Sequence, residues 1–304
     1  MRLANGLLAL LVFPGLLFAM PCAWFFVWIE RKTVAWMQRR IGPPLLQPFL
    51  DFVKLLAKRT PQRYRADAFL MQLWPLLSVA AMAGALALLP VFPHSTGFSG
   101  DLVLLVMLLE LPSVFTIVAG FSSRSLFGEI GSTREALFSL GYSVVFLAAF
   151  GAIALSSASL RLQDAALATA NPARWIALLA ILLCIPAKLR LNPFSTASAE
   201  QEIYSGPLTE YAGPELAFWE LAHGLEWVAL TGVIATFALP RTGAILPDAA
   251  AFVAGCVCLV LLLSLGAAAT ARFTLRFSLR IFWRWGFTLA LVALASASFL
   301  RMKP

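Results

Sequence analysis

The stretch LVLLVMLLELPSVFTIVAGF, residues 102–121, decides the class of this protein. Its 20 residues include a single charged side chain, Glu110. About 20 largely apolar residues are enough for a helix to cross the hydrocarbon core of a bilayer. The segment therefore predicts a membrane-spanning helix, and the question becomes how many others accompany it.

The composition of the whole chain agrees with a membrane protein. Hydrophobic residues make up 61% and charged residues 12%, whereas an ordinary soluble domain carries roughly 25% charged residues. We predict an all-α integral membrane protein that forms one membrane domain over residues 1–304. The apolar runs indicate about eight transmembrane helices, near residues 7–29, 69–92, 102–121, 136–157, 175–188, 215–239, 249–270 and 282–300.

The basic residues predict the orientation of these helices. The expected cytoplasmic loops are 30–68, 122–135, 189–214 and 271–281. Seventeen of the 23 Lys and Arg residues lie in or beside these four loops, and such residues concentrate on the cytoplasmic side. We therefore expect a multi-pass protein of the bacterial cytoplasmic (inner) membrane with both termini on the periplasmic side. The same bias explains the net charge of +8 without a nucleic-acid partner.

The four cysteines do not predict a redox or metal centre. Cys22, Cys184, Cys256 and Cys258 all lie in apolar stretches, and none belongs to the C-x-x-C or Cys/His patterns that bind zinc or iron–sulfur clusters. We therefore expect no metal site, no catalytic residues and no cofactor bound by this chain.

Acidic residues inside the apolar runs are the first functional signal. A charged residue at the centre of a membrane helix costs roughly 2.5–3.5 kcal/mol on insertion scales. Glu110 interrupts the third run, and the sixth carries Glu215, Glu220, His223 and Glu226 on one helical face. Each acid alone could be a buried ion pair, which is our interpretation of Glu215 at the membrane edge. The other four residues together predict an ion-translocation relay.

The first cytoplasmic loop carries a second signal. Phe49, Phe52, Val53 and Leu56 repeat at the spacing of one helical face and follow a Gly-Pro-Pro sequence at residues 42–44. This pattern predicts an amphipathic helix on the membrane surface. The alternative is a solvated, charge-rich connector.

Two other loops carry polar motifs. Residues 128–135, GEIGSTRE, suggest a tight cytoplasmic loop, and they lack the GxxxxGK[ST] pattern of a nucleotide-binding loop. The segment 189–214 is acidic on an otherwise basic side of the membrane. It is either a docking surface for a soluble partner, which we favour, or polar padding.

Taken together, the motifs resemble the NADH-quinone oxidoreductase subunit 1 family, which forms the membrane heel of complex I and has relatives in membrane-bound group 4 NiFe-hydrogenases. The motifs span most of the chain in the order of the family. They are Glu30-Arg31-Lys32, Gln38 with Arg40-x-Gly42-Pro43, Gln47-Pro48 with Asp51 and Lys54-Leu55-Leu56, Gly131-Ser132-x-Arg134-Glu135, Asn192-Pro193-Phe194, and Glu200-x-Glu202 through Glu210-Tyr211-x-Gly213.

Departures from the complex I pattern favour the hydrogenase branch. Gly42-Pro43-Pro44 leads directly into Leu45-Leu46-Gln47-Pro48. The pattern that complex I members resemble has several more residues before the Leu-Leu-Gln. Tyr142 is followed by Ser143 in place of Glu, and Ser195 stands where the family has Asp. The resemblance thus implies the membrane-anchoring and coupling subunit of a formate hydrogenlyase-like complex. The alternatives are a quinone-site subunit of complex I and a stand-alone secondary transporter, although we find no internal repeat of the kind transporters show.

The resemblance also implies partners and site residues. The expected partners are hydrogenase-like large and small subunits, an iron–sulfur subunit and antiporter-like membrane subunits. These partners would carry the iron–sulfur clusters and the NiFe site, and a bound quinone is the less favoured possibility. The relay would couple redox-driven movement of the loops to proton or sodium displacement. The residues expected to face the redox subunits are Arg40, Asp51, Arg134, Glu135, Glu200, Glu202, Glu210 and Tyr211.

Overall fold

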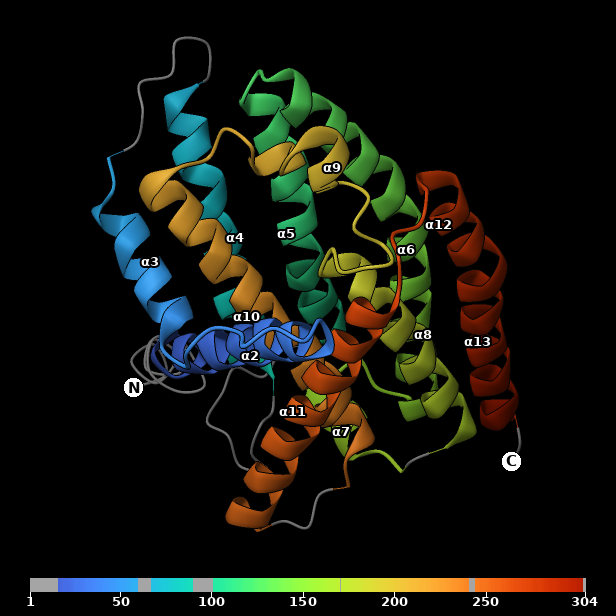
Figure 1. The fold of residues 1–304 in the computed structure, drawn as a ribbon. Coiled ribbons are helices and arrows are strands. Elements are labelled where there is room, and N and C mark those ends of the chain that lie inside the picture. Colours follow the sequence, from blue (N-terminus) through green and yellow to red (C-terminus); the bar gives the residue numbers. More distant parts are fainter. Residues whose placement is uncertain (1–15, 60–66, 90–100, 170, 241–243, 303–304) are drawn as a thin grey trace.

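The computed structural model describes residues 16–59, 67–89, 101–169, 171–240 and 244–302, and every named element in them is helical (Figure 1). The fold class is therefore all-α, as predicted. The elements are α2 (Leu16–Met37), α3 (Gln47–Ala57), α4 (Ala68–Leu88), α5 (Leu102–Ser122), α6 (Leu126–Ser157), α7 (Leu162–Leu167), α8 (Pro172–Lys188), α9 (Glu200–Ile203), η1 (Gly206–Leu208), α10 (Gly213–Ala238), α11 (Ile245–Ala269), α12 (Leu275–Ile281), η2 (Phe282–Gly286) and α13 (Phe287–Met302).

Six helices in the described part of the chain are long and apolar enough to cross a membrane. They coincide with six of the eight predicted spans: α4, α5, α6, α10, most of α11, and the continuous helix Leu275–Arg301, which passes through the π-helical turn η2.

The other two predicted spans are not confirmed. The span at 7–29 begins outside the described residues, and α2 continues eight residues beyond its predicted end, through the charged residues Glu30-Arg31-Lys32. In Figure 1 this helix runs across the direction of its neighbours. The span at 175–188 corresponds to α8, which has only 17 residues. Eight crossings therefore remain a prediction, of which six are supported by length and composition.

Helix α10 forms the centre of the bundle. It packs against α2, α3, α4 and α11, and 83% of its most apolar 18-residue window is buried. The corresponding shares are 22% for α11 and 28% for Leu275–Arg301. Glu215 and Glu226 of α10 are consequently buried, whereas Glu220 is exposed. Helices α11 and α13 present apolar side chains outward, where lipid or another membrane subunit can cover them.

The segment 122–135 is not the loop that we predicted, because α6 begins at Leu126. Its two glycines permit close packing and do not form a turn. A Cβ atom on Gly131 would lie 2.6 Å from Cδ of Pro207 in η1, and one on Gly128 would lie 2.9 Å from the carbonyl oxygen of Gly120 in α5. The glycine motif therefore joins the start of α6 to α5 and η1.

This packing predicts that Gly131→Ala destabilises the protein by about 1–3 kcal/mol, the usual cost of overpacking a well-packed interior. Gly266→Ala is the matched control, since a Cβ atom there meets nothing within 4 Å and removing a helical glycine stabilises by roughly 0.5–1 kcal/mol. Thermal unfolding of the purified protein in detergent measures both. Equal midpoints for the two variants would contradict the packing argument.

Helix α3 lies where the amphipathic helix was predicted. Its Phe52 ring lies 5.6 Å from that of Trp24 in α2 and 6.5 Å from that of Phe218 in α10. Val53 and Leu56 belong to the same predicted apolar face but remain 45% and 40% exposed. Part of this face thus packs on the bundle, and its contact with a membrane surface remains a prediction.

Candidate functional site

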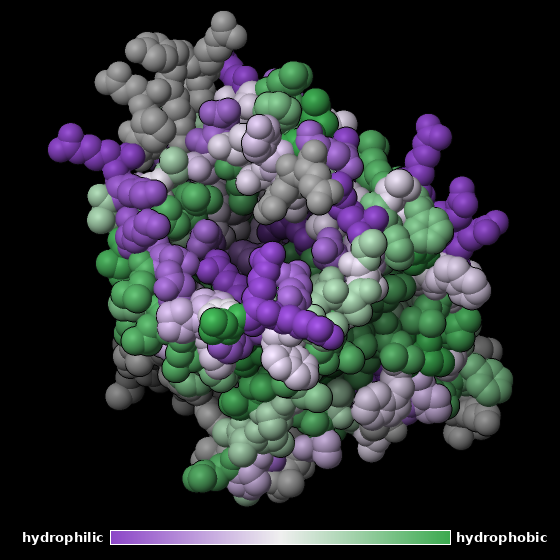
Figure 2. Space-filling view, viewed as in Figure 1, coloured by the Kyte–Doolittle hydropathy of each residue, from purple (hydrophilic) through white to green (hydrophobic). Residues whose placement is uncertain are grey.

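A cavity of about 450 Å³ lies between α2, α3, α10 and the segment that follows α8. Figure 2 shows hydrophilic residues gathered around a hollow in the middle of this face of the molecule. The volume is within the range of pockets that hold small molecules, roughly 300–1,000 Å³. We take this cavity as the candidate site.

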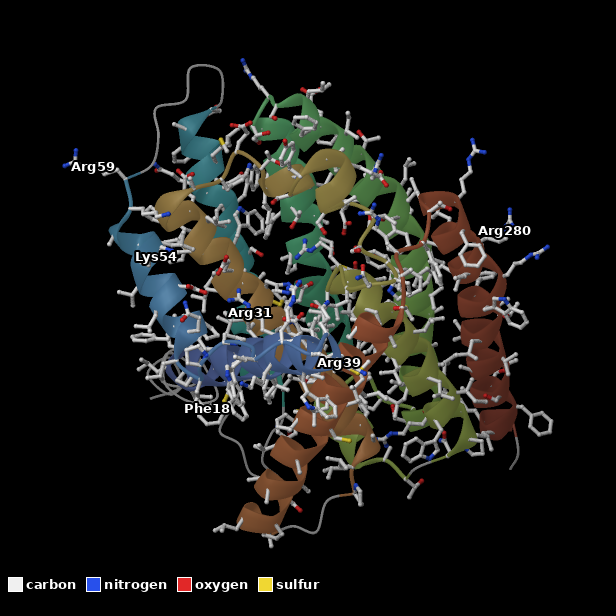
Figure 3. The ribbon with its side chains drawn as sticks, viewed as in Figure 1. Phe18, Arg31, Arg39, Lys54, Arg59 and Arg280 are labelled. Atoms are coloured by element: carbon white, nitrogen blue, oxygen red, sulfur yellow. The ribbon has the colours of Figure 1, made fainter. Side chains whose placement is uncertain are left out.

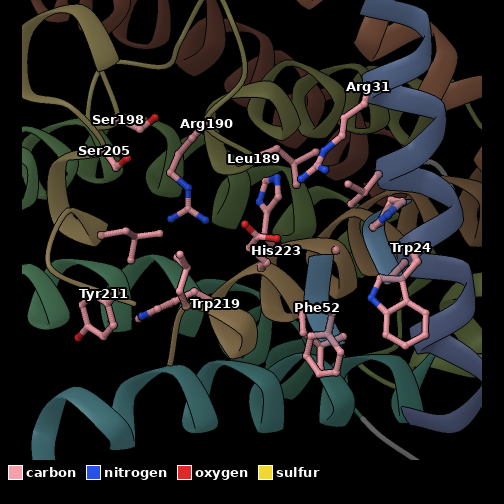
Figure 4. Close-up of a pocket in the computed structure, with 18 of the residues that line it drawn as sticks. Trp24, Arg31, Phe52, Leu189, Arg190, Ser198, Ser205, Tyr211, Trp219 and His223 are labelled. Carbon is pink, nitrogen blue, oxygen red and sulfur yellow. The ribbon is translucent and has the colours of Figure 1, made fainter. Parts of the chain in front are cut away.

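The cavity has an apolar end and a polar end. Trp24 and Phe52 line the side toward α2 and α3, whereas Arg190 and His223 point in from the opposite side (Figure 4). Trp219 also lines it and is only 3% exposed, and its indole Nε1–H has no hydrogen-bond partner in the described structure. The cavity therefore offers apolar walls together with a small set of hydrogen-bond donors.

One buried ion pair lies at the polar end. Arg190 Nη2 is 3.4 Å from Glu226 Oε2, and Arg190 Nη1 donates a 2.9 Å hydrogen bond to Thr116 Oγ1 on α5. His223 Nδ1 is 3.8 Å from the same Glu226 oxygen. Because Glu226 is 1% exposed while His223 lines the cavity, these residues connect the cavity to the interior of the bundle.

A second buried ion pair lies between α5 and α8. Lys188 Nζ is 3.0 Å from Glu110 Oε1, and Ser143 Oγ donates a 2.7 Å hydrogen bond to Glu110 Oε2. The Lys188 side chain is fully buried, with its ammonium 5.3 Å and 4.8 Å from the ring centroids of Tyr142 and Phe146. Cation–π attraction therefore adds to the ion pair.

The carboxyl group of Glu135 completes this set of interior polar groups. It is 1% exposed, and its Oε1 is 3.0 Å from the hydroxyl oxygen of Tyr142, which is also 3.0 Å from Ser113 Oγ. We call the two ion pairs and this group the central ionic cluster, made up of Glu110, Ser113, Thr116, Glu135, Tyr142, Ser143, Lys188, Arg190 and Glu226.

The structure places the four predicted relay residues in different surroundings. Glu226 belongs to the cluster, and His223 and Glu220 both line the cavity next to it. Glu110 lies in the other ion pair of the cluster. Three of the four residues thus lie at or beside the cavity, with Glu220 exposed, whereas Glu110 lies in the separate pair with Lys188. Transport of an ion through these residues remains a prediction.

Several of the predicted interface residues are exposed, as a docking surface requires. Glu202 on α9 pairs with Arg134 at 2.6 Å and with Arg272 at 2.8 Å, and its side chain is 49% exposed. These two guanidinium groups, Arg134 foremost, hold the pKa of Glu202 below its usual range. Arg40 and Glu210 are exposed as well.

Asp51 instead anchors α3 to α2. It accepts hydrogen bonds from Arg31 at 3.0 Å and from Gln47 at 2.8 Å, which joins two of the motifs recognised in the sequence. Figure 3 shows Arg31 reaching into the molecule, whereas Arg59 and Arg280 project outward from opposite edges.

Two predicted interface residues are interior residues, which corrects their assignment. Glu135 is 1% exposed, because residues 126–135 are helical and turn it toward the bundle. Tyr211 is 4% exposed and packs edge-on against Trp219, with ring centroids 5.8 Å apart. In this structure neither side chain is available to a soluble partner. For Glu200, the first residue of α9, the structure describes the backbone and not the side chain.

Lys188 and Arg190 belong to the site but were not among the residues predicted from the sequence. Both belong to the basic residues that mark the cytoplasmic side, where an anchoring role is the ordinary expectation. The position of Lys188 within an apolar helix, two residues after Pro186, was the available signal.

No group of three or more His, Cys, Asp or Glu residues that could hold a metal ion occurs in the part of the chain that the structure describes. The cavity is the site at which we test the fit of a quinone-like ring, which the resemblance makes possible. Its residues fit such a ring, since the His223 imidazole and the unpaired Trp219 Nε1–H could hold a polar head between apolar walls.

Comparison with known proteins supplies a family. The family model described as NADH dehydrogenase matches residues 9–298. A subunit of the NADH-quinone oxidoreductase of Brevibacillus brevis is 30% identical over 236 residues, which cover 73% of this chain and 69% of that subunit. The corresponding subunit from Neisseria meningitidis serogroup C is 27% identical over 229 residues, 69% of this chain and 64% of that subunit.

One further sequence relative and one solved structure carry other names. Hydrogenase-4 component C of Escherichia coli is 29% identical over 245 residues, which cover 78% of each chain. Among solved structures, a chain of the membrane-bound sulfane sulfur reductase, an archaeal respiratory membrane complex, has the same fold. The TM-score is 0.87, with 24% identity and coverage of 97% of this chain and 99% of that chain.

Proposed function

This chain belongs to the NADH dehydrogenase family, and on that premise we propose that it is the membrane-anchoring and coupling subunit of a group 4 NiFe-hydrogenase-type, formate hydrogenlyase-like complex. The match over residues 9–298 confirms the family predicted from the motifs. At the coarser level, the chain is a membrane subunit of a complex I-like or hydrogenase-like respiratory complex.

The observation that carries the coupling role is the central ionic cluster. Ionisable groups within membrane segments are costly, and they mark proton or ion pathways when they face the interior of a bundle. Here two ion pairs and a further carboxyl group lie inside the bundle, and one end of the set reaches a cavity. We propose that electrons remain in partner subunits and that this cluster responds to them by displacing protons or sodium ions.

The details of the cluster favour the hydrogenase branch over complex I. Ser143 stands at the position where the complex I pattern has a glutamate, and its hydroxyl donates a hydrogen bond to Glu110. Glu110 is further neutralised by Lys188, so this site is built around one carboxylate and not two. The backbone N–H of Gln47 donates to the Pro44 carbonyl oxygen, so that α3 begins three residues after the end of the short Gly-Pro-Pro sequence. The extent of the match to hydrogenase-4 component C supports the same branch.

We place the soluble partners on the face that carries Arg134, Glu202 and Arg272. Exposed charges that are already ordered by ion pairs give a partner a fixed electrostatic pattern to recognise. The proposed partners are hydrogenase-like large and small subunits with an iron–sulfur subunit, and antiporter-like subunits within the membrane. The proposed location is the bacterial inner membrane with both termini periplasmic.

A quinone-site subunit of complex I is the second candidate. The cavity favours it, because its volume, apolar walls and free Trp219 Nε1–H suit an amphiphilic ring. In that case His223 and Trp219 would hold the polar head of the ring. The replacement of two acidic family positions by Ser143 and Ser195 favours the hydrogenase reading.

Purification of the tagged chain from native membranes in mild detergent tests the proposal. We expect mass spectrometry to identify a large subunit with paired C-x-x-C motifs that ligate nickel and iron, together with iron–sulfur subunits. Membranes with the untagged chain are the control. Recovery of NADH-oxidising subunits would support the second candidate instead. Recovery of the chain alone would overturn both and favour a stand-alone transporter.

A further inference from the structure

The buried carboxyl groups of the central ionic cluster are not equivalent. Glu110 has the Lys188 ammonium at 3.0 Å, and Glu226 has the Arg190 guanidinium at 3.4 Å. Glu135 is as deeply buried as Glu226, yet no cation of the described residues lies within 4.0 Å of it. The two cations of the cluster are thus each paired with another carboxylate.

This arrangement determines which carboxyl group holds a proton. A carboxylate removed from water without a paired cation is strongly disfavoured, and the group instead takes up a proton. The charges that act on Glu135 from neighbouring elements are Arg190 and Lys188, which favour ionisation, and Glu226, which opposes it. Because both cations are engaged elsewhere, the neutral form of Glu135 suits the arrangement seen in the structure.

The hydroxyl group of Tyr142 can serve both charge states of Glu135. Its single hydrogen has two acceptors, Glu135 Oε1 and Ser113 Oγ, each 3.0 Å from the Tyr142 oxygen. When Glu135 is protonated, Glu135 donates to Tyr142 and Tyr142 donates to Ser113. When Glu135 is ionised, Tyr142 donates to Glu135 and Ser113 donates to Tyr142. Both arrangements keep the two 3.0 Å contacts of the Tyr142 oxygen hydrogen-bonded without movement of a heavy atom.

We propose that Glu135 is the proton-exchanging carboxyl group of this chain, and that Tyr142 and Ser113 form a reversible hydrogen-bond switch that accommodates its two charge states. The inference rests on the proposed coupling function. It adds a residue and a mechanism that the relay of Glu110, Glu220, His223 and Glu226 does not contain.

Glu226 is the partner in the exchange. Its Oε1 is buried and has no hydrogen-bond partner in the described structure, so it can receive a proton. A proton lost by Glu135 and gained by Glu226 leaves the total charge of the cluster unchanged. It also releases Arg190 from Glu226 and makes its positive charge available to the new Glu135 carboxylate. His223, 3.8 Å from Glu226, then connects that carboxyl group to the cavity.

Infrared spectroscopy of the purified complex at neutral pH tests the protonation directly, without a pumping assay. We expect the wild type to show a carboxylic acid C=O band that shifts in heavy water. Glu135→Gln, which keeps the shape of a protonated carboxyl group, should remove that band. Glu129→Gln is the matched control, since Glu129 is exposed on the same helix and should leave the band unchanged.

Tyr142→Phe supplies a second test in case Glu135→Gln does not assemble. Loss of the hydroxyl group should shift the frequency of the Glu135 band while the band itself persists. A band that persists in Glu135→Gln, or one that Tyr142→Phe leaves at its wild-type frequency, would overturn the inference. In sealed vesicles we also expect Glu135→Gln to lose ion pumping while it retains redox turnover.

The vesicle assay separates failure of this inference from failure of the proposed function. If the wild type pumps and Glu135→Gln pumps equally well, the inference is wrong and the coupling function stands. If redox turnover of the wild type drives no ion movement, the coupling function is wrong. The infrared result then decides by itself whether Glu135 holds a proton.

Discussion

Lys188→Met is expected to destabilise the protein by about 3–5 kcal/mol, the usual cost when one partner of a buried ion pair is removed. The substitution keeps an unbranched side chain of similar volume beside the Tyr142 and Phe146 rings, so that little volume is lost. What changes is the charge facing Glu110, whose carboxylate would keep only the hydrogen bond from Ser143. The thermal unfolding midpoint of the purified complex and the yield of folded protein measure the effect.

The double variant Lys188→Met with Glu110→Gln is the control for this prediction. A glutamine at position 110 can still accept the hydrogen bond from Ser143, and no buried charge is left without a partner. We therefore expect the double variant to recover most of the stability lost in the single variant, as replaced ion pairs often do. A single variant as stable as the wild type would mean that Glu110 is already neutral in the native protein.

The number and place of most membrane spans could be predicted from the sequence, because a span is a local property of about 20 residues. The two spans that are not confirmed show where this locality ends. Residues 30–37 continue α2 beyond its apolar run, since the charges there find partners elsewhere: Arg31 on Asp51, and Lys32 on the carbonyl oxygen of Ile41. Contacts made by distant residues cannot be read from hydropathy.

The candidate site was predicted only in part, because it also depends on contacts between residues that are distant in the sequence. Acids such as Glu110 and Glu226 stand out because their neighbours in the sequence are apolar. Glu135 lies among polar residues that read as a loop, and only the packing of α6 against η1 reveals that it is buried. The pairing of Glu110 with Lys188 joins residues 78 positions apart, which a single sequence does not relate.

Glu226→Gln is expected to leave the complex assembled and its redox turnover intact, while ion pumping falls about a hundredfold, the lower end of what a positioned proton-transfer group contributes. A glutamine fits the same space and can still accept a hydrogen bond from Arg190, so we expect the fold to be retained. It cannot take up or release a proton, which interrupts the route between the cavity and the interior. Pumping by sealed vesicles, measured beside redox turnover, reports both quantities.

The contrast with Glu129→Gln makes the result specific to the buried position, because Glu129 is exposed and contributes to neither ion pair. Pumping by Glu226→Gln at the wild-type rate would remove Glu226 from the route. A parallel fall in turnover and pumping would mean instead that Glu226 serves assembly or the docking of the redox subunits. Loss of pumping alone is the outcome that a route through the Arg190–Glu226 pair requires, since only the charge of one buried carboxyl group has been changed.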